Sequence, residues 1–100
     1  MTGKLKLKKW DSAAHLETEK DIARYWEACL EVGGDDPAFI TAALGNIARA
    51  RGMTQLARKT GLTREGLYKA LSPGGNPEFG TVMRVIRALG LELRGAAAKG

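Results

Sequence analysis

The stretch MTQLARKTGLTREGLYKALS, residues 53–72, contains the pattern that decides the fold of this chain. Gly61 stands where a helix ends and the chain turns sharply, a backbone conformation that glycine reaches without a Cβ penalty. Thr63 then offers a side-chain oxygen that can cap a second helix. The apolar residues on either side of the turn are spaced to face one core: Leu56, Ala57, Leu62, Leu67, Ala70 and Leu71. The stretch predicts a helix-turn-helix over residues 54–72, and the alternative is an ordinary helical hairpin without a ligand.

Two longer helices are expected upstream of this motif. The first spans residues 19–32 and has Thr18 as its N-cap. The second begins at Pro37, where the missing N–H costs nothing, behind an Asp36 cap. Gly52 ends this second helix, after basic residues that suit the negative helix terminus.

The motif and the chain after it supply three shorter helices. Those of the motif span residues 55–60, capped by Thr54, and residues 64–71. The last helix is expected to begin at Pro77 behind an Asn76 cap. Its expected core face is Phe79, Val82, Met83, Ile86 and Leu89. The pattern therefore predicts an all-α fold with five helices.

Both ends of the chain alternate polar and apolar residues, at positions 4–8 and 91–94, which fits two short β-strands. The two could pair within one chain or across a dimer. The expected organisation is a basic N-terminal segment over residues 1–17, a helix-turn-helix domain over residues 18–94 and a flexible tail over residues 95–100.

The net charge of +5 is unevenly distributed along the 100 residues. Residues 1–10 carry +4, residues 11–37 carry −6 from two basic and eight acidic residues, and residues 38–100 carry +7 from ten basic and three acidic residues. The helix-turn-helix lies in the last, basic block. Basic residues near phosphates release counterions and drive sequence-independent affinity for DNA. The charge pattern favours double-stranded DNA as a ligand, and the alternative is a solvated basic surface.

The composition argues against several other classes of protein. An apolar content of 44% is typical of one globular domain. We find no apolar run long enough for a membrane span and no signal peptide, so a cytoplasmic location is expected. Cys29 and His15 are the only residues of their kinds, which excludes an internal disulfide and clusters of these metal ligands. We expect no metal, cofactor or enzymatic activity, and we expect Cys29 to be buried.

The second helix of the motif presents a polar face opposite its core positions. Arg64 lies in the first turn, where recognition helices reach base edges, and can present two donors to guanine. Glu65 can accept from cytosine or hold Arg64 or Lys69 in position. Tyr68 can touch a thymine methyl group or a phosphate, or only border the core. We expect base contacts from Thr63, Arg64, Glu65, Tyr68 and Lys69, and Thr63 also suits a phosphate.

Phosphate contacts fix the register of a protein on DNA without reading sequence. The residues expected in this role are Gln55, Arg58, Lys59 and Ser72. Gly66 is unusual because glycine inside a helix costs up to about 1 kcal/mol relative to alanine. It indicates either a loose helix or a close approach to a neighbouring backbone or to DNA. Because one motif offers few contacts, we expect a homodimer on a palindromic operator.

The run ALGNIARARGMTQLARKTGLTREGLYKALSPGGNPEFGTVMRVIRALGL, residues 43–91, closely resembles the addiction-module antidote family, which comprises HigA-like antitoxins with a Cro/C1-type helix-turn-helix. ARARGMTQLA and GLTREGLYKAL are its most specific segments, and the similarity extends upstream through Asp36 and Pro37. The resemblance implies a compact five-helix bundle of the lambda-repressor-like type. It also implies a bacterial type II antitoxin that binds a RelE/ParE-like toxin and represses its own operon.

Toxins of that kind are expected to be basic, since they engage RNA. The acidic block would complement such a surface, with Glu19, Asp21, Glu27 and Glu31 as candidate toxin-binding residues. The alternative is that these acids only keep the first helix soluble. Two other hypotheses about the function of the chain stay open. One is a freestanding Cro/C1-type regulator without a toxin partner, and the other is a protein-interaction module whose DNA surface has decayed.

Overall fold

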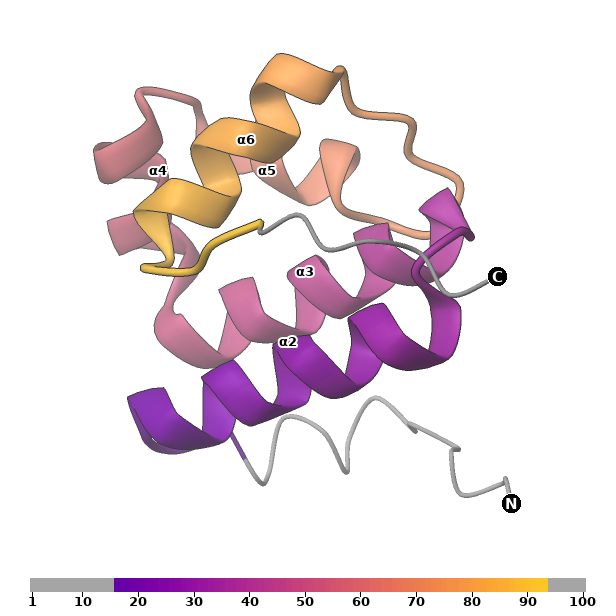
Figure 1. Ribbon diagram of the computed structural model, residues 1–100. Coiled ribbons are helices and arrows are strands. Elements are labelled where there is room, and N and C mark those ends of the chain that lie inside the picture. The colour runs from indigo at the N-terminus through magenta and orange to yellow at the C-terminus, as the bar shows by residue number, and fades with distance from the viewer. Residues whose placement is uncertain (1–15, 94–100) are drawn as a thin grey trace.

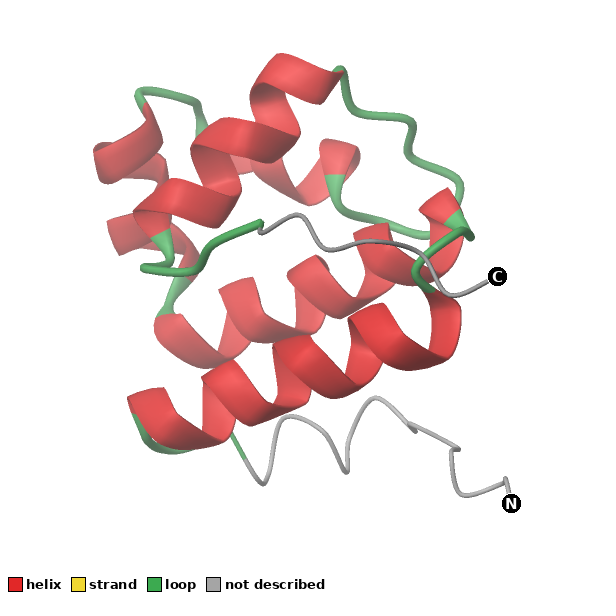
Figure 2. Cartoon of the chain, viewed as in Figure 1, coloured by secondary structure: helices red, strands yellow, loops and turns green. Residues whose placement is uncertain are grey.

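The computed structural model describes residues 16–93, which form five helices and no strand (Figures 1 and 2). The helices are α2 (Glu19–Gly33), α3 (Pro37–Arg51), α4 (Met53–Thr60), α5 (Arg64–Ala70) and α6 (Phe79–Ala88). The all-α class is thus confirmed for this part of the chain. Some predictions lie outside the described residues. They are the strand at residues 4–8, the tail over residues 95–100 and the basic N-terminal segment except its last two residues; His15 also lies outside.

The strand predicted near the C-terminus is wrong for residues 91–93, which are irregular. The backbone N–H of Leu91 donates to the carbonyl of Ile86 at 3.0 Å and so closes the end of α6. The carbonyl of Glu92 accepts a hydrogen bond from the indole Nε1 of Trp26 on α2, at 3.1 Å. These contacts hold the segment against the helices.

The caps predicted for the two long helices are confirmed. The hydroxyl of Thr18 accepts from the backbone N–H of Asp21 at 3.0 Å, and the Asp21 carboxylate accepts from the N–H of Thr18 at 3.1 Å. This reciprocal pair is a capping box at the start of α2. At the start of α3, the carboxylate of Asp36 accepts from the N–H of Ala38 at 3.0 Å, and Pro37 occupies the first helical position.

The start predicted for α4 is wrong, because the helix begins at Met53 and Thr54 does not cap it. Gly52 alone separates α3 from α4, at a positive φ of 110° that favours glycine. Its N–H donates to the carbonyl of Ala48 at 2.9 Å, and its own carbonyl accepts from the N–H of Leu56 at 3.1 Å. The early start places Met53 in the core with 6% of its surface exposed.

The start predicted for α6 is also wrong. Asn76 and Pro77 belong to the preceding loop, and the helix begins at Phe79 with Glu78 as an N-cap that makes no side-chain bond. Gly75 explains the delay, because a Cβ on it would lie only 2.5 Å and 2.6 Å from two carbonyl oxygens at the end of α5. The chain therefore follows the end of α5 before it can start another helix.

The two long helices α2 and α3 lie side by side and run in opposite directions (Figure 1). α3 leads into α4, and α4 contacts both α5 and α6. α3 thus lies between α2 and the helix-turn-helix candidate.

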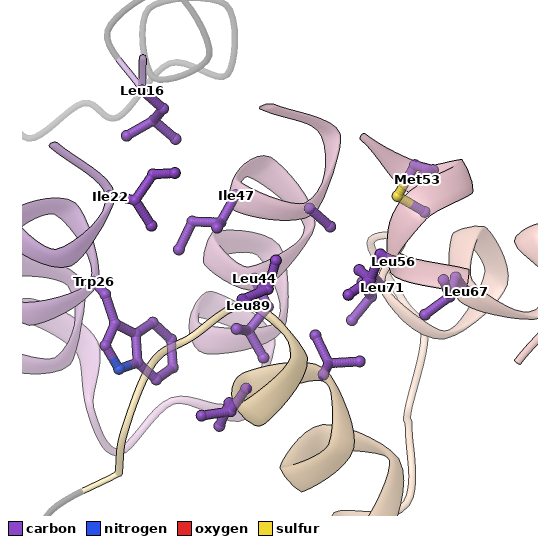
Figure 3. Close-up of a cluster of buried hydrophobic side chains, with 13 residues drawn as sticks. Leu16, Ile22, Trp26, Leu44, Ile47, Met53, Leu56, Leu67, Leu71 and Leu89 are labelled. Atoms are coloured by element: carbon purple, nitrogen blue, oxygen red, sulfur yellow. The ribbon is translucent and has the colours of Figure 1, made fainter. Parts of the chain in front are cut away.

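Side chains from every described helix meet in one core, part of which is drawn in Figure 3. The buried residues include Ile22, Trp26, Leu44, Ile47, Leu56, Leu67, Leu71, Val85 and Ile86. The predicted core face of α6 is wrong at Phe79, which is 72% exposed, and it missed Val85, which is fully buried. Phe79 is the first residue of its helix, so its side chain lies at the open margin of the core. Burial of Cys29 is confirmed.

Candidate nucleic-acid interface

Hydrogen bonds of Thr60 and Gly61 hold the turn between α4 and α5. Gly61 adopts a left-handed conformation with φ 78°, and its N–H donates to the carbonyl of Ala57 at 2.9 Å. The buried hydroxyl of Thr60 donates to the carbonyl of Leu56 at 2.9 Å and accepts from the N–H of Leu62 at 3.3 Å. Sequence reasoning did not single out Thr60. The available signal was a threonine directly before the glycine that ends a helix, where its hydroxyl can reach back to a carbonyl one turn earlier.

The start of α5 is held by the cap predicted from the sequence. The hydroxyl oxygen of Thr63 accepts from the backbone N–H of Gly66 at 2.9 Å. A Cβ on Gly66 would lie 3.0 Å from that same oxygen. The only close neighbour of Gly66 in the described residues is thus the side chain that caps its own helix and not a neighbouring backbone, and a close approach to DNA stays a prediction. The Thr63 hydroxyl keeps its hydrogen available to donate outward.

The inner face of α5 anchors the helix in the core. Leu67 is fully buried and Leu71, which caps the helix, is 2% exposed. α3 packs directly on this end of α5, because a Cβ on Gly45 would lie only 2.8 Å from the carbonyl oxygen of Leu71. The contact with α3, together with the packing of α4, thus helps to position the outer face of α5.

The predicted base-reading residues share the exposed side of α5. Arg64, Glu65, Tyr68 and Lys69 are all exposed, as is Thr63 at the helix start. The guanidinium carbon of Arg64 lies 5.8 Å from the centre of the Tyr68 ring, a cation–π contact that orients both side chains. Tyr68 is 43% exposed, so its side chain is accessible to a ligand, and its contact with DNA stays a prediction. Glu65 forms no ion pair with the described residues, so it does not hold Arg64 or Lys69 here.

The predicted phosphate contacts divide into two groups. Gln55, Arg58 and Lys59 are exposed on α4, and their side chains make no hydrogen bond within residues 16–93. Ser72 differs, because it is half-buried and its hydroxyl donates to the carbonyl of Lys69 at 2.9 Å. Ser72 would have to give up this bond before it could donate to a phosphate.

The loop after α5 borders a hollow of about 410 Å³ beside the candidate interface. Gly66, Lys69 and Ala70 line it from the helix, and residues 72–77 line it from the loop. Gly74 has a φ of 86°, and Gly75 is packed under the last carbonyls of α5. These two adjacent glycines were noted in the sequence without a role, and the structure shows that they let the loop fold tightly against α5.

The predicted toxin-binding acids separate into two pairs along α2. At the helix start, Glu19 forms an ion pair with Arg51 at 3.2 Å. The Asp21 carboxylate accepts two backbone N–H groups, and the bond from Thr18 is the main cause that lowers its pKa below the ordinary value. Farther along, Glu27 and Glu31 are exposed and form no ion pair in the described part of the chain. Glu27 and Glu31 thus have no partner to exchange within the described residues, whereas Glu19, although 83% exposed, would give up its ion pair with Arg51.

The described residues contain no group of three acidic, histidine or cysteine side chains arranged to hold a metal ion. Among residues 16–93, no helix combines the length and apolar character that crossing a bilayer requires. Burial raises the pKa of the Cys29 thiol, which favours the protonated form.

Comparisons with known proteins address the family of the chain. The family model of the probable addiction module antidote protein matches residues 6–97. A curated relative from Haemophilus influenzae, described as an uncharacterized protein, is 51% identical over 88 residues, which cover 88% of this chain and 89% of the relative. No solved structure matches. Membership of such a family suggests that a protein is an antitoxin with a regulatory rather than an enzymatic role. It also implies a toxin partner of some kind. The chain thus belongs to the family of probable addiction module antidote proteins.

Proposed function

We propose that this protein is the DNA-binding antitoxin of a bacterial type II toxin–antitoxin module. It neutralises a RelE/ParE-like toxin and, as a homodimer of Cro/C1-type helix-turn-helix domains, represses its own operon through a palindromic operator. The two activities use different parts of the molecule. α5 contacts DNA and the acidic side of α2 contributes to toxin binding.

The observation that carries the DNA-binding half is the exposed polar side of α5. Its cap, its buried leucines and its contact with α3 fix the helix, yet Arg64, Tyr68 and Lys69 project away from the core. The cation–π contact between Arg64 and Tyr68 holds both side chains on this exposed side, where they can meet a ligand. Their position on the second helix of the motif and the basic charge of this half of the chain favour the DNA major groove.

Substitutions on α5 test DNA binding, with the region upstream of the protein's own gene as the probe. Arg64→Ala should relax specificity at one base pair and cost roughly 1–3 kcal/mol, as expected for a bidentate contact to guanine. Arg58→Ala on α4 should weaken binding to all DNA sequences alike. It should also reduce by about one the slope of log affinity against log salt concentration. Arg24→Ala is the matched control, since Arg24 is an exposed arginine on α2. Equal binding by all three variants and the native protein would contradict the proposal.

The toxin-binding half rests on the family and on the charge of α2. Its test is co-expression with the proteins encoded by the genes that flank its own, followed by co-purification and a measurement of toxin activity. A stable complex that silences the toxin is the expected result. A chain that binds its operator but no such partner would instead be a freestanding regulator.

A further inference from the structure

The described residues contain an apolar groove that the helix-turn-helix does not use. It lies between α2, α3 and α6, with a volume of about 380 Å³, and its apolar lining includes Trp26, Leu30, Ile40 and Val82. Phe79 and Leu93 border it and are 72% and 46% exposed. Two of the four large exposed hydrophobic side chains in residues 16–93 thus belong to one groove. Such a concentration marks a surface that a partner covers.

The margin of this groove is acidic. Asp35 lines the groove itself, and two neighbouring hollows extend over α2, since all three share Leu30. These hollows add Glu27, Glu31 and Glu92, against a single basic residue, Arg24. An apolar groove with four acids and one base at its edges fits a basic partner that inserts apolar side chains.

We propose that this groove is the docking site for a basic protein segment with a large apolar anchor, and that the segment belongs to the toxin of the proposed function, on which this inference rests. A second copy of the chain fits less well. A two-fold contact pairs the same patch on both subunits, which would bring two acidic margins together. DNA is disfavoured for the same reason, because the margin repels phosphates.

The groove leaves the candidate DNA interface uncovered. None of the residues expected to contact bases or phosphates lines it. A partner in the groove and an operator on α5 can therefore be bound at once, so substitutions in the groove should separate the two activities.

Phe79 is the most informative position to change, because so much of its side chain is exposed that substitution disturbs little packing. The probe is the flanking-gene protein that co-purifies with the native chain, and affinity is measured by calorimetry. Phe79→Glu should weaken the complex roughly 30-fold or more, the effect of losing an aromatic anchor. Phe79→Leu should retain most of the affinity. Val32→Glu is the matched control, because Val32 is 57% exposed on α2 but does not line the groove.

The acidic margin is tested by two double charge reversals with the same change in net charge. Glu27→Lys with Glu31→Lys should lower the affinity roughly tenfold at low salt, and the loss should shrink as salt screens it. Glu17→Lys with Glu65→Lys changes two exposed acids that line neither the groove nor the two hollows, and it should have a much smaller effect. Equal losses in both variants would show that net charge, rather than the margin, attracts the partner.

The outcomes separate the two proposals. If the native chain forms no complex, the antitoxin function fails and the groove loses its occupant. If it forms one that Phe79→Glu leaves intact, only the groove proposal is overturned. If Phe79→Glu changes the oligomeric state of the protein in the absence of any partner, the occupant of the groove is a second copy of the chain. If it only lowers the melting temperature, the occupant is a terminal segment of the chain itself.

Discussion

Replacing Gly45 by alanine adds one methyl group where α3 meets the end of α5. The new Cβ would lie 2.8 Å from the carbonyl oxygen of Leu71 and 3.4 Å from the Nη1 of Arg49. The arginine can move, but the carbonyl belongs to the backbone that closes α5. The two helices must therefore separate at this point.

The size of the effect follows from two opposing terms. Overpacking a filled site costs typically about 1–3 kcal/mol, whereas alanine gains about 1 kcal/mol over glycine inside a helix. Gly45→Ala should thus lower the free energy of unfolding by about 1 kcal/mol. Gly80→Ala, in α6, is the matched control, because no atom lies within 4 Å of its added Cβ. It should raise stability by about 0.5–1 kcal/mol.

Thermal unfolding followed by circular dichroism compares the two variants. At about 4–8 °C per kcal/mol for a domain of this size, their melting temperatures should differ by roughly 10 °C, with the native protein between them. Gly45→Ala should also weaken operator binding at temperatures where it is folded, since the outer face of α5 moves with Leu71. Equal melting temperatures for Gly45→Ala and Gly80→Ala would refute the conclusion that α3 positions α5.

Three other predictions follow from the caps and the buried thiol. Thr63→Ala should cost about 1 kcal/mol in urea denaturation through the lost cap on Gly66, and Thr63→Ser should restore it. The pKa of Asp21 is lower in the folded protein than in the unfolded chain, where it is about 3.9. The Asp21 carboxylate therefore stabilises the fold at pH values above about 3.9, and this stabilisation is lost as the pH falls through the pKa of the folded state. The melting temperature of Asp21→Asn should therefore approach that of the native protein in acid, and a constant difference would contradict this. Cys29 should react with iodoacetamide only slowly until the protein unfolds.

Local signals in the sequence predicted the features that depend on local chemistry. The caps at Thr18, Asp36 and Thr63 and the left-handed turn at Gly61 each involve residues within four positions of one another. Their geometry is determined by neighbouring side chains, so it can be read from a single chain. The exposed side of α5 was predictable for the same reason, since helical periodicity alone places it.

The features that prediction missed depend on contacts between distant parts of the chain. Met53 joins α4 because the core requires its side chain, although Thr54 is the better cap by type. The segment at Glu92 forms no strand because the Trp26 indole, 66 residues earlier, binds its carbonyl. The groove at Phe79 likewise exists only once three helices have packed. The acidic block was visible in the sequence. The sequence did not show that Glu19 pairs with Arg51 and Asp21 caps α2, whereas Glu27 and Glu31 form no ion pair in the described residues.

The connection through Gly52 bears on how the molecule tolerates changes in length. Since one residue joins α3 to α4 and both of its backbone polar groups are bonded, an added residue there would rotate α4, and α5 with it, about α3. The loop at Pro73 and Gly74, by contrast, is exposed and lies between helices that an extra residue need not reorient. Length variation at the first junction should therefore be absent from functional variants.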